Sequence, residues 1–298
     1  MELDELNYHF GLGGVVEFGR GPGGLTQASV NAPGGTATVL LHGAHVTGYR
    51  PAGGEPVLWM SRRSWFEPGK PVRGGVPVCF PWFSSTGPAA DSPHHGFARL
   101  REWEVESTGL DGDLAEITLV LLADDDTRRY WLGQFELRLR VTVSETLSVS
   151  LEAENTGGEA FTITEALHSY LAVSDIRGVR ITGLAGAEYV DTVGETTRRR
   201  QGDEPIRFAG ETDRAYVNTE SACVLDDPGM GRRITVAQSG SASTVVWNPW
   251  SAKAARMPDY GDDEWPGMVC IETANIYDNA VTLAPGEAHT MEARIGVE

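Results

Sequence analysis

Two side chains that are far apart in the chain could act together as a general acid and a general base. His168 stands in the strand-like run Thr164–Tyr170, and the near-neutral intrinsic pKa of imidazole makes it a good proton donor at physiological pH. Glu272 ends the otherwise apolar run Gly267–Glu272, where a carboxylate must be paired, hydrogen-bonded or functional because its uncompensated burial is costly. A satisfied structural histidine and a structurally paired glutamate are the alternatives.

A second group of candidates is basic and lies beside glycines. The segment Arg73–Phe83 begins with Arg-Gly-Gly, and the segment His94–Arg99 follows it closely. Glycine lets the backbone approach a ligand, while a guanidinium offers planar hydrogen-bond donors to an oxyanion. Arg73 and Arg99 could therefore clamp a phosphate, although a surface position or an ion pair is the ordinary role of an arginine.

Adjacent histidines and a tryptophan loop give weaker signals. On an extended segment His94 and His95 would point to opposite sides, so we expect only one of them to face a small ligand. No third ligand stands at a suitable spacing, so we expect no metal site. The loop Trp247–Trp250 carries aromatic surface of the kind that stacks on sugar rings, although simple packing explains two tryptophans equally well.

The elements that must position these side chains have the pattern of β-strands. Apolar and polar residues alternate over Phe135–Val143 and again over Leu147–Glu154, which predicts two half-buried strands joined as a hairpin. No long segment has a convincing helical periodicity, which disfavours repeated βαβ units. We therefore predict an all-β architecture of two large antiparallel sheets packed face to face. Similar runs are Thr36–Leu41, Glu116–Leu122, Phe161–Leu171, Ile234–Ala237, Thr244–Trp247, Met268–Glu272 and Met291–Val297.

Composition excludes several classes of function. The chain is 41% hydrophobic and 22% charged, and no polar linker divides it, so we expect one domain over residues 1–298. Its net charge of −18 should repel nucleic acid and anionic lipid, and no apolar stretch reaches the roughly 18 residues of a membrane span. Three widely spaced cysteines and an acidic N-terminus without a signal-peptide pattern favour the cytoplasm. We expect a monomer.

Taken together and in their order along the chain, these stretches and several others resemble the aldose 1-epimerase superfamily. Within it, they resemble the hexose-6-phosphate mutarotase branch. Arg73–Trp82 and His95–Arg99 together form a specific signature, whereas each later stretch alone is a weak match. The resemblance extends over about residues 40 to 280. The matching stretches are Gly43–His45, Glu55–Trp59, Arg73–Phe83, His95–Arg99, Ala166–Tyr170, Glu211–Arg214, Trp247–Trp250 and Met268–Asn275.

The resemblance implies a galactose mutarotase-like β-supersandwich that needs no cofactor and no metal. It implies that His168 is the general acid and that Glu272 is the general base. It also implies that Asp213 contacts a sugar hydroxyl and that Arg73 and Arg99 bind phosphate.

The same resemblance implies that His94 and His95 are among the substrate-binding residues. The family commonly has glutamine at the position of His94. The segment Phe83–Gly87 also departs from the more usual Phe-Gly. Both departures affect the rim of the expected pocket.

The reaction implied is the interconversion of the α and β anomers of a hexose 6-phosphate. The base removes the proton of the C1 hydroxyl while the acid protonates the ring oxygen, and the ring opens to the aldehyde. Rotation about the C1–C2 bond and ring closure then give the other anomer. The alternatives are a mutarotase for unphosphorylated sugars, a non-catalytic carbohydrate-binding sandwich, and a glycosidase that uses Asp213 and Glu272 as its two carboxylates.

Overall fold

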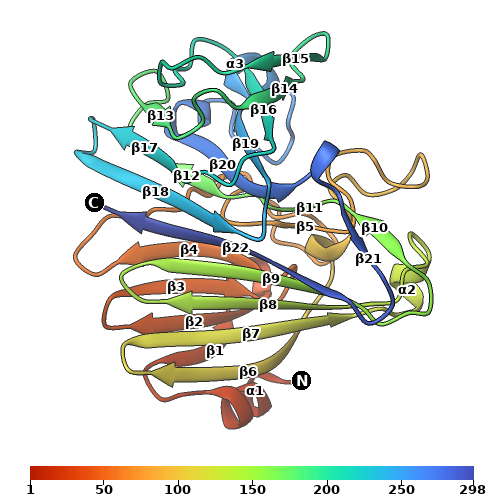
Figure 1. Ribbon diagram of the computed structural model, residues 1–298. Coiled ribbons are helices and arrows are strands. Elements are labelled where there is room, and N and C mark those ends of the chain that lie inside the picture. Colours follow the sequence, from red (N-terminus) through yellow and green to blue (C-terminus); the bar gives the residue numbers. More distant parts are fainter.

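The computed structural model describes residues 1–298 and consists mainly of β-strands (Figure 1). The all-β prediction is confirmed, because the helices are few and short. None of them combines the length and the apolar character that crossing a lipid bilayer requires. The α-helices are α1 (Leu3–Phe10), α2 (Asp125–Arg128) and α3 (Trp250–Ala254), and 3-10 turns occupy Pro22–Gly24, Ala98–Leu100, Trp265–Gly267 and Tyr277–Asn279.

One eight-stranded antiparallel sheet forms a broad layer through the molecule (Figure 1). In spatial order its strands are β13 (Arg180–Thr182), β17 (Cys223–Asp227), β18 (Arg232–Ser239), β22 (Ala288–Val297), β9 (Leu147–Asn155), β8 (Phe135–Val143), β7 (Leu114–Leu122) and β6 (Glu104–Asp111). The predicted hairpin is confirmed, since β8 pairs with β9 in one continuous register. Every second side chain of both strands, such as Leu139 and Leu151, is fully buried. Each buried Val, Leu or Phe side chain of these strands stabilises the fold by about 1.5 to 3 kcal/mol relative to an exposed position.

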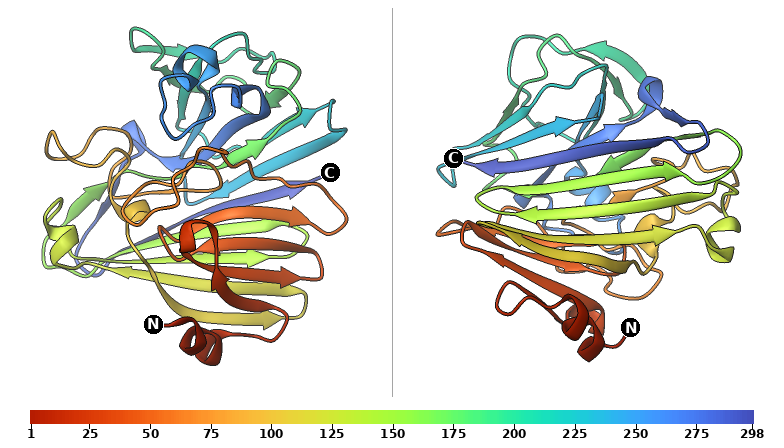
Figure 2. Two further views of the ribbon diagram at one scale, coloured as in Figure 1. Left: turned by 180° about the vertical axis from the view of Figure 1, so that it is seen from behind. Right: turned by 60° about the horizontal axis from the view of Figure 1, so that its bottom comes forward.

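A four-stranded antiparallel sheet covers one face of this layer, and Figure 2 shows the two sheets stacked. Its strands follow the chain order: β1 (Val16–Arg20), β2 (Thr26–Ala32), β3 (Gly35–Leu40) and β4 (His45–Pro51). Strand β2 packs against β7 and β8, and β3 packs against β8. Apolar side chains of both sheets, among them Val30, Val39 and Leu119, merge into one core.

A second eight-stranded sheet carries the candidate functional residues. Its strands are β15 (Thr197–Arg200), β14 (Glu188–Asp191), β16 (Thr212–Val217), β19 (Ser243–Asn248), β20 (Met268–Asn275), β11 (Glu165–Leu167) and β5 (Val78–Cys79), with β12 (Tyr170–Ala172) also paired to β20. A small sheet pairs β10 (Phe161–Ile163) with β21 (Val281–Leu283). The prediction of large antiparallel sheets is confirmed, but there are four sheets and not two.

The run Phe161–Leu171, expected as one strand, is divided into β10, β11 and β12. Both β11 and β12 pair with β20, but His168 and Ser169 lie between them. The backbone N–H of His168 donates to the carbonyl oxygen of Pro77, which continues the pairing of β11 with β5. The register against β20 is the same on both sides of the gap and places His168 opposite Glu272.

Strand β20 is buried along its whole length. Glu272 lies inside this strand, opposite Val245 of β19, and not at its end as the apolar run suggested. The Glu272 side chain is only 1% exposed. Its protonation therefore depends strongly on its burial and on its protein neighbours.

A buried carboxylate ties the two eight-stranded sheets together. Glu165 of β11 is fully buried and accepts a hydrogen bond from the side-chain amide of Asn275 in β20, 2.9 Å away. His289 of β22, in the other sheet, places Nε2 3.2 Å from the same Glu165 oxygen. The hydrogen bond with Glu165 raises the pKa of His289, although partial burial opposes the rise. The link between the sheets is thus strongest while His289 is protonated.

We predict that His289→Gln destabilises the fold more in acid than in base. Because the folded-state pKa of His289 lies above its unfolded value, its extra contribution is fully present below about pH 6.5 and is lost as pH rises through the folded-state pKa. The expected loss of unfolding free energy is about 1 to 3 kcal/mol at pH 6 and less at pH 9. Urea denaturation at both pH values measures it, with His9→Gln on the exposed face of α1 as the control. An equal loss at both pH values contradicts the prediction.

Candidate active site

The candidate residues converge on one pocket of about 300 Å³. This volume is at the lower end of the range usual for small-molecule sites. The pocket is lined by segments from the second eight-stranded sheet and by the loops around residues 73 and 94. All seven residues indicated by the sequence line it: Arg73, His94, His95, Arg99, His168, Asp213 and Glu272.

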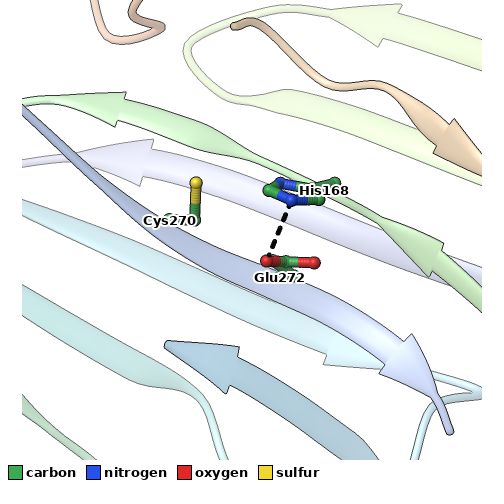
Figure 3. Close-up of side chains that lie close together, drawn as sticks. All are labelled: His168, Cys270 and Glu272. Carbon is green, nitrogen blue, oxygen red and sulfur yellow. Dashed lines mark ion pairs between the residues drawn. The ribbon is translucent and has the colours of Figure 1, made fainter. Parts of the chain in front are cut away.

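His168 and Glu272 meet at the break between β11 and β12 (Figure 3). His168 Nε2 lies 3.3 Å from Glu272 Oε1, and both side chains are almost fully buried. Burial lowers the pKa of His168 well below its ordinary value, and the charges of Arg73 and Arg99 lower it further. Burial raises the pKa of Glu272 well above its ordinary value, and the carboxylate of Asp213 adds to the rise. Both shifts favour a neutral imidazole beside a protonated carboxyl, so the pair holds one proton.

Aromatic contacts hold the His168 ring on two sides. It stacks on Tyr170 with ring centroids 4.7 Å apart and planes 9° from parallel. Trp247 meets it edge to face at 6.1 Å. The hydroxyl of Tyr170 accepts a hydrogen bond from Arg73 Nη1 at 3.0 Å, which in turn fixes the stacking partner. The ring is thereby held at one angle toward Glu272.

The glycines after Arg73 serve the fold and not, as expected, a close approach of the backbone to a ligand. Neither lines the pocket, and both have positive φ, 113° at Gly74 and 62° at Gly75. A Cβ atom on Gly74 would lie 2.5 Å from the carbonyl oxygen of Trp59, and one on Gly75 would lie 2.2 Å from that of Val46. Larger residues would therefore push the segment that carries Arg73 away from its neighbours.

His45 fixes the same segment from β4. It is fully buried, and its Nε2 lies 2.7 Å from the carbonyl oxygen of Gly74. Burial lowers the pKa of His45 to about 3, so the ring is neutral and donates its Nε2–H to that carbonyl. This contact gives a structural reason for the stretch Gly43–His45 in the motif series.

The two arginines of the pocket differ in how their charge is compensated. Arg73 donates from Nε and Nη2 to the carboxylate of buried Asp259 over 3.1 to 3.3 Å. Arg99 donates from Nη2 to the carbonyl oxygen of His94 at 2.6 Å, but it has no carboxylate partner and its buried Nε has no partner at all. The Arg99 side chain is only 6% exposed, and burial lowers its pKa. A buried guanidinium without a counter-ion that borders a pocket is suited to an anionic ligand.

Both adjacent histidines line the pocket, so the expectation that only one would do so is wrong. His95 has a φ of 61°, so the segment is turned and not extended, and the rings of His94 and His95 meet edge to face at 4.0 Å. Burial lowers the pKa of His95 well below its ordinary value, which keeps the ring neutral. The backbone N–H of Ser84 donates to His95 Nδ1 at 3.0 Å. The proton of the ring is therefore on Nε2, which is available to donate to a ligand.

Asp213 is paired with a cation that the sequence analysis did not single out. Lys253 of α3 places Nζ 3.6 Å from Asp213 Oδ2 and 2.9 Å from Glu211 Oε1. It also lies over the ring of Trp247 at 5.8 Å. Burial raises the pKa of Asp213, and Lys253 opposes the rise. In the sequence, the only sign that Lys253 belongs to the site was its position three residues after Trp250, the last residue of the tryptophan loop.

Two further contributors were also missed. Tyr170 shares a face with His168 in the strand-like run, which was a signal for its position but not for its stacking. Asp259 lies in a polar loop, where nothing in the local pattern marks it as the partner of an arginine. Of the two tryptophans of the loop, Trp247 lines the pocket, whereas Trp250 packs against Trp265 with ring centroids 4.3 Å apart.

Comparisons with known proteins agree on one family. The family model described as "Aldose 1-epimerase" matches residues 27–296. A protein of Salmonella typhimurium named "Putative glucose-6-phosphate 1-epimerase" is 39% identical over 246 residues, which cover 82% of this chain and 81% of that protein. A protein of Escherichia coli K12 with the same name is 36% identical over 266 residues, which cover 89% of this chain and 88% of that protein.

Solved structures share the fold. The crystal structure of a "putative mutarotase" from Salmonella typhimurium has a TM-score of 0.88 at 33% identity and covers 95% of this chain and 93% of its own. A galactose mutarotase-like protein from Clostridium acetobutylicum has a TM-score of 0.73 at 17% identity, covers 95% and 98%, and supports the fold alone. These likenesses confirm the galactose mutarotase-like all-β class.

We predict that the His168 imidazole stays neutral between about pH 5 and 8, where a free histidine titrates. Burial and the nearby guanidinium groups hold the His168 pKa well below its ordinary value, while Glu272 keeps the shared proton. Side-chain NMR of labelled histidine, with the His168→Asn spectrum for assignment, measures the midpoint. The urea-unfolded chain is the control and should titrate near about 6.5. A His168 midpoint near that value in the folded protein contradicts the prediction.

Proposed function

The chain belongs to the aldose 1-epimerase family, and we propose that it interconverts the α and β anomers of a hexose 6-phosphate. Relatives that carry the name glucose-6-phosphate 1-epimerase and cover most of this chain support glucose 6-phosphate as the substrate. The protein is an isomerase. We further propose that His168 and Glu272 transfer the protons and that Arg99 selects a phosphorylated sugar.

The observation that carries the proposal is the 3.3 Å separation of His168 Nε2 and Glu272 Oε1 in one buried pocket. Anomerisation moves protons at two oxygens, the C1 hydroxyl and the ring oxygen, and both are bonded to the same carbon. An acid and a base that serve these oxygens must therefore be close neighbours. A hydrolase that displaces a leaving group from C1 instead needs two carboxylates about 5 to 9.5 Å apart, one on each side of the sugar.

The proton shared by the pair is sufficient for the whole cycle. In the reactive form Glu272 is ionised and His168 is protonated. Glu272 takes the proton of the C1 hydroxyl as His168 gives its proton to the ring oxygen, and the C1–O5 bond breaks to leave the open-chain aldehyde. After rotation about the C1–C2 bond, the two transfers run in reverse and the C1–O5 bond forms again on the other face. No atom is gained or lost.

Burial acts on this cycle in a definite direction. Ring opening converts the charged form of the pair into the neutral form, in which Glu272 is protonated and His168 is not. Burial favours that neutral form, because it raises the pKa of Glu272 and lowers the pKa of His168. Burial therefore favours the complex of the open-chain aldehyde with the neutral pair over the complex of the closed ring with the charged pair.

Arg99 gives the pocket its preference for a phosphorylated sugar. The chain as a whole has a net charge of −18, which repels an anion. Within the pocket, the charge of Arg73 is compensated by Asp259 and that of Lys253 by Glu211 and Asp213, whereas Arg99 has no acidic partner. Screening limits the repulsion of the distant surface charges to about 8 Å at physiological salt. The uncompensated guanidinium can therefore dominate the local field.

We predict that His168→Asn and Glu272→Gln each lower kcat by about 10²- to 10⁴-fold, because each removes one of the two proton-transfer groups. Exchange between the anomeric proton signals of glucose 6-phosphate, followed by NMR, measures the rate. Thermal unfolding shows that each variant is folded. Because the two groups share one proton, the double variant should be no slower than the slower single variant. Losses that multiply, or a near-normal rate in either single variant, contradict the shared mechanism.

We predict that Arg99→Ala raises KM for glucose 6-phosphate by about 10- to 100-fold, the usual loss for a charge-assisted hydrogen bond to a phosphate. The rate with unphosphorylated glucose should change far less. Arg62→Ala removes an exposed, salt-bridged arginine outside the pocket and is the matched control. Equal losses with both sugars would instead favour a mutarotase for unphosphorylated sugars.

A further inference from the structure

A third metal-binding side chain lies beside the acid and base (Figure 3). Cys270 precedes Glu272 by two residues in β20, so both side chains are on the same face of the strand. The Cys270 sulfur, a His168 nitrogen and a Glu272 oxygen all lie within 4.8 Å of one another, and all three residues are buried. The sequence showed no such set, because His168 joins the other two only through the fold.

The three donors suit one class of cation. Sulfur, imidazole nitrogen and carboxylate oxygen are the ligands that zinc prefers, whereas magnesium and calcium take oxygen ligands almost alone. Two buried atoms of the cluster, Glu272 Oε2 and His168 Nδ1, also have no hydrogen-bond partner in the protein. His168 and Glu272 line the pocket, so a fourth position on the ion could face the pocket and take water.

We infer that His168, Cys270 and Glu272 bind one zinc ion and that the ion excludes the sugar from the pocket. The ion takes the His168 imidazole and the Glu272 carboxylate, the two groups that serve the ring oxygen and the C1 hydroxyl. Zinc is therefore an inhibitor of this protein and not a cofactor. The binding site stands on the geometry alone, while the inhibition rests on the function proposed above.

The charges around the cluster are compatible with a dication. Burial favours the protonated thiol of Cys270 and the protonated carboxyl of Glu272, so zinc binding releases their protons, and the two ionised groups then neutralise the ion. Of the two arginines that line the pocket, Arg73 is compensated by Asp259. Arg99 has no carboxylate partner, so its positive charge repels the ion.

The first test is zinc binding by the full chain after removal of metals, measured by competition with a chromophoric chelator. We expect one zinc ion per chain. Cys270→Ala should weaken binding by at least about 10-fold, the loss usual even for a residue that only orients a ligand. Cys223→Ala is the matched control, because Cys223 is equally buried but lies in β17 of the other eight-stranded sheet. No binding by the unaltered chain, or equal binding by the Cys270→Ala variant, overturns the inference.

A second measurement needs no substitution at the cluster. Cobalt(II) that replaces zinc at a thiolate ligand gains a charge-transfer absorption, which should appear in the unaltered chain and in Cys223→Ala. If this absorption is absent from the unaltered chain and from Cys223→Ala, Cys270 is not a ligand. This result holds even where Cys270→Ala fails to fold.

The activity assay separates this inference from the proposed function. We expect added zinc to slow the exchange of glucose 6-phosphate anomers, and excess substrate should relieve the inhibition. If the chain exchanges the anomers at a normal rate but binds no zinc, only the zinc site is contradicted. If the chain binds zinc but does not exchange the anomers, only the proposed function is contradicted.

Discussion

A single proton shared between a buried imidazole and a buried carboxyl is the interaction on which the rest of this structure depends. His168 and Glu272 can hold it between them because both side chains are buried, so that the neutral form of each group is favoured. Exposure of the two side chains would return both pKa values toward their ordinary range. The surrounding sheet therefore has to keep the pair both close and buried.

The neighbourhood of the pair is a series of charges that compensate one another. On one side Asp259 pairs with Arg73, whose Nη1 fixes the Tyr170 ring that stacks on His168. On the other side Lys253 lies between Glu211 and Asp213. These pairs leave little net charge near the proton, which preserves the effect of burial. The exception is Arg99, whose uncompensated charge is the feature that an anionic substrate can use.

The sequence predicted the strands well because alternation depends only on which face of a sheet is buried, and the hairpin of β8 and β9 was found in this way. It predicted which residues line the pocket through the motif series. It could not predict that Gly74 and Gly75 approach Trp59 and Val46, because that contact depends on segments that meet only in three dimensions. The pairing of Arg73 with Asp259 was hidden for the same reason.

The adjacent histidines show a different limit. The expectation that only one would face a ligand assumed an extended backbone, but the left-handed φ of His95 turns both rings to the pocket. The break before Tyr170 is similar, because the backbone N–H of Ser169 donates to the carbonyl oxygen of Leu167 and not to β20. Alternation describes regular strands, and the site is built where regular pairing stops.

The same two strands carry both the reacting pair and the tie between the large sheets. Glu165 precedes His168 by three residues, and Asn275 follows Glu272 by three residues, and Glu165 lies opposite Asn275 in the register of β11 and β20. A slip of one residue in this register would turn every side chain to the other face and would destroy the tie and the pair together. The buried contact with His289 therefore specifies the register that the chemistry requires. The pairing of β11 with β20 thus contributes both to the contact between the large sheets and to the position of the acid and the base.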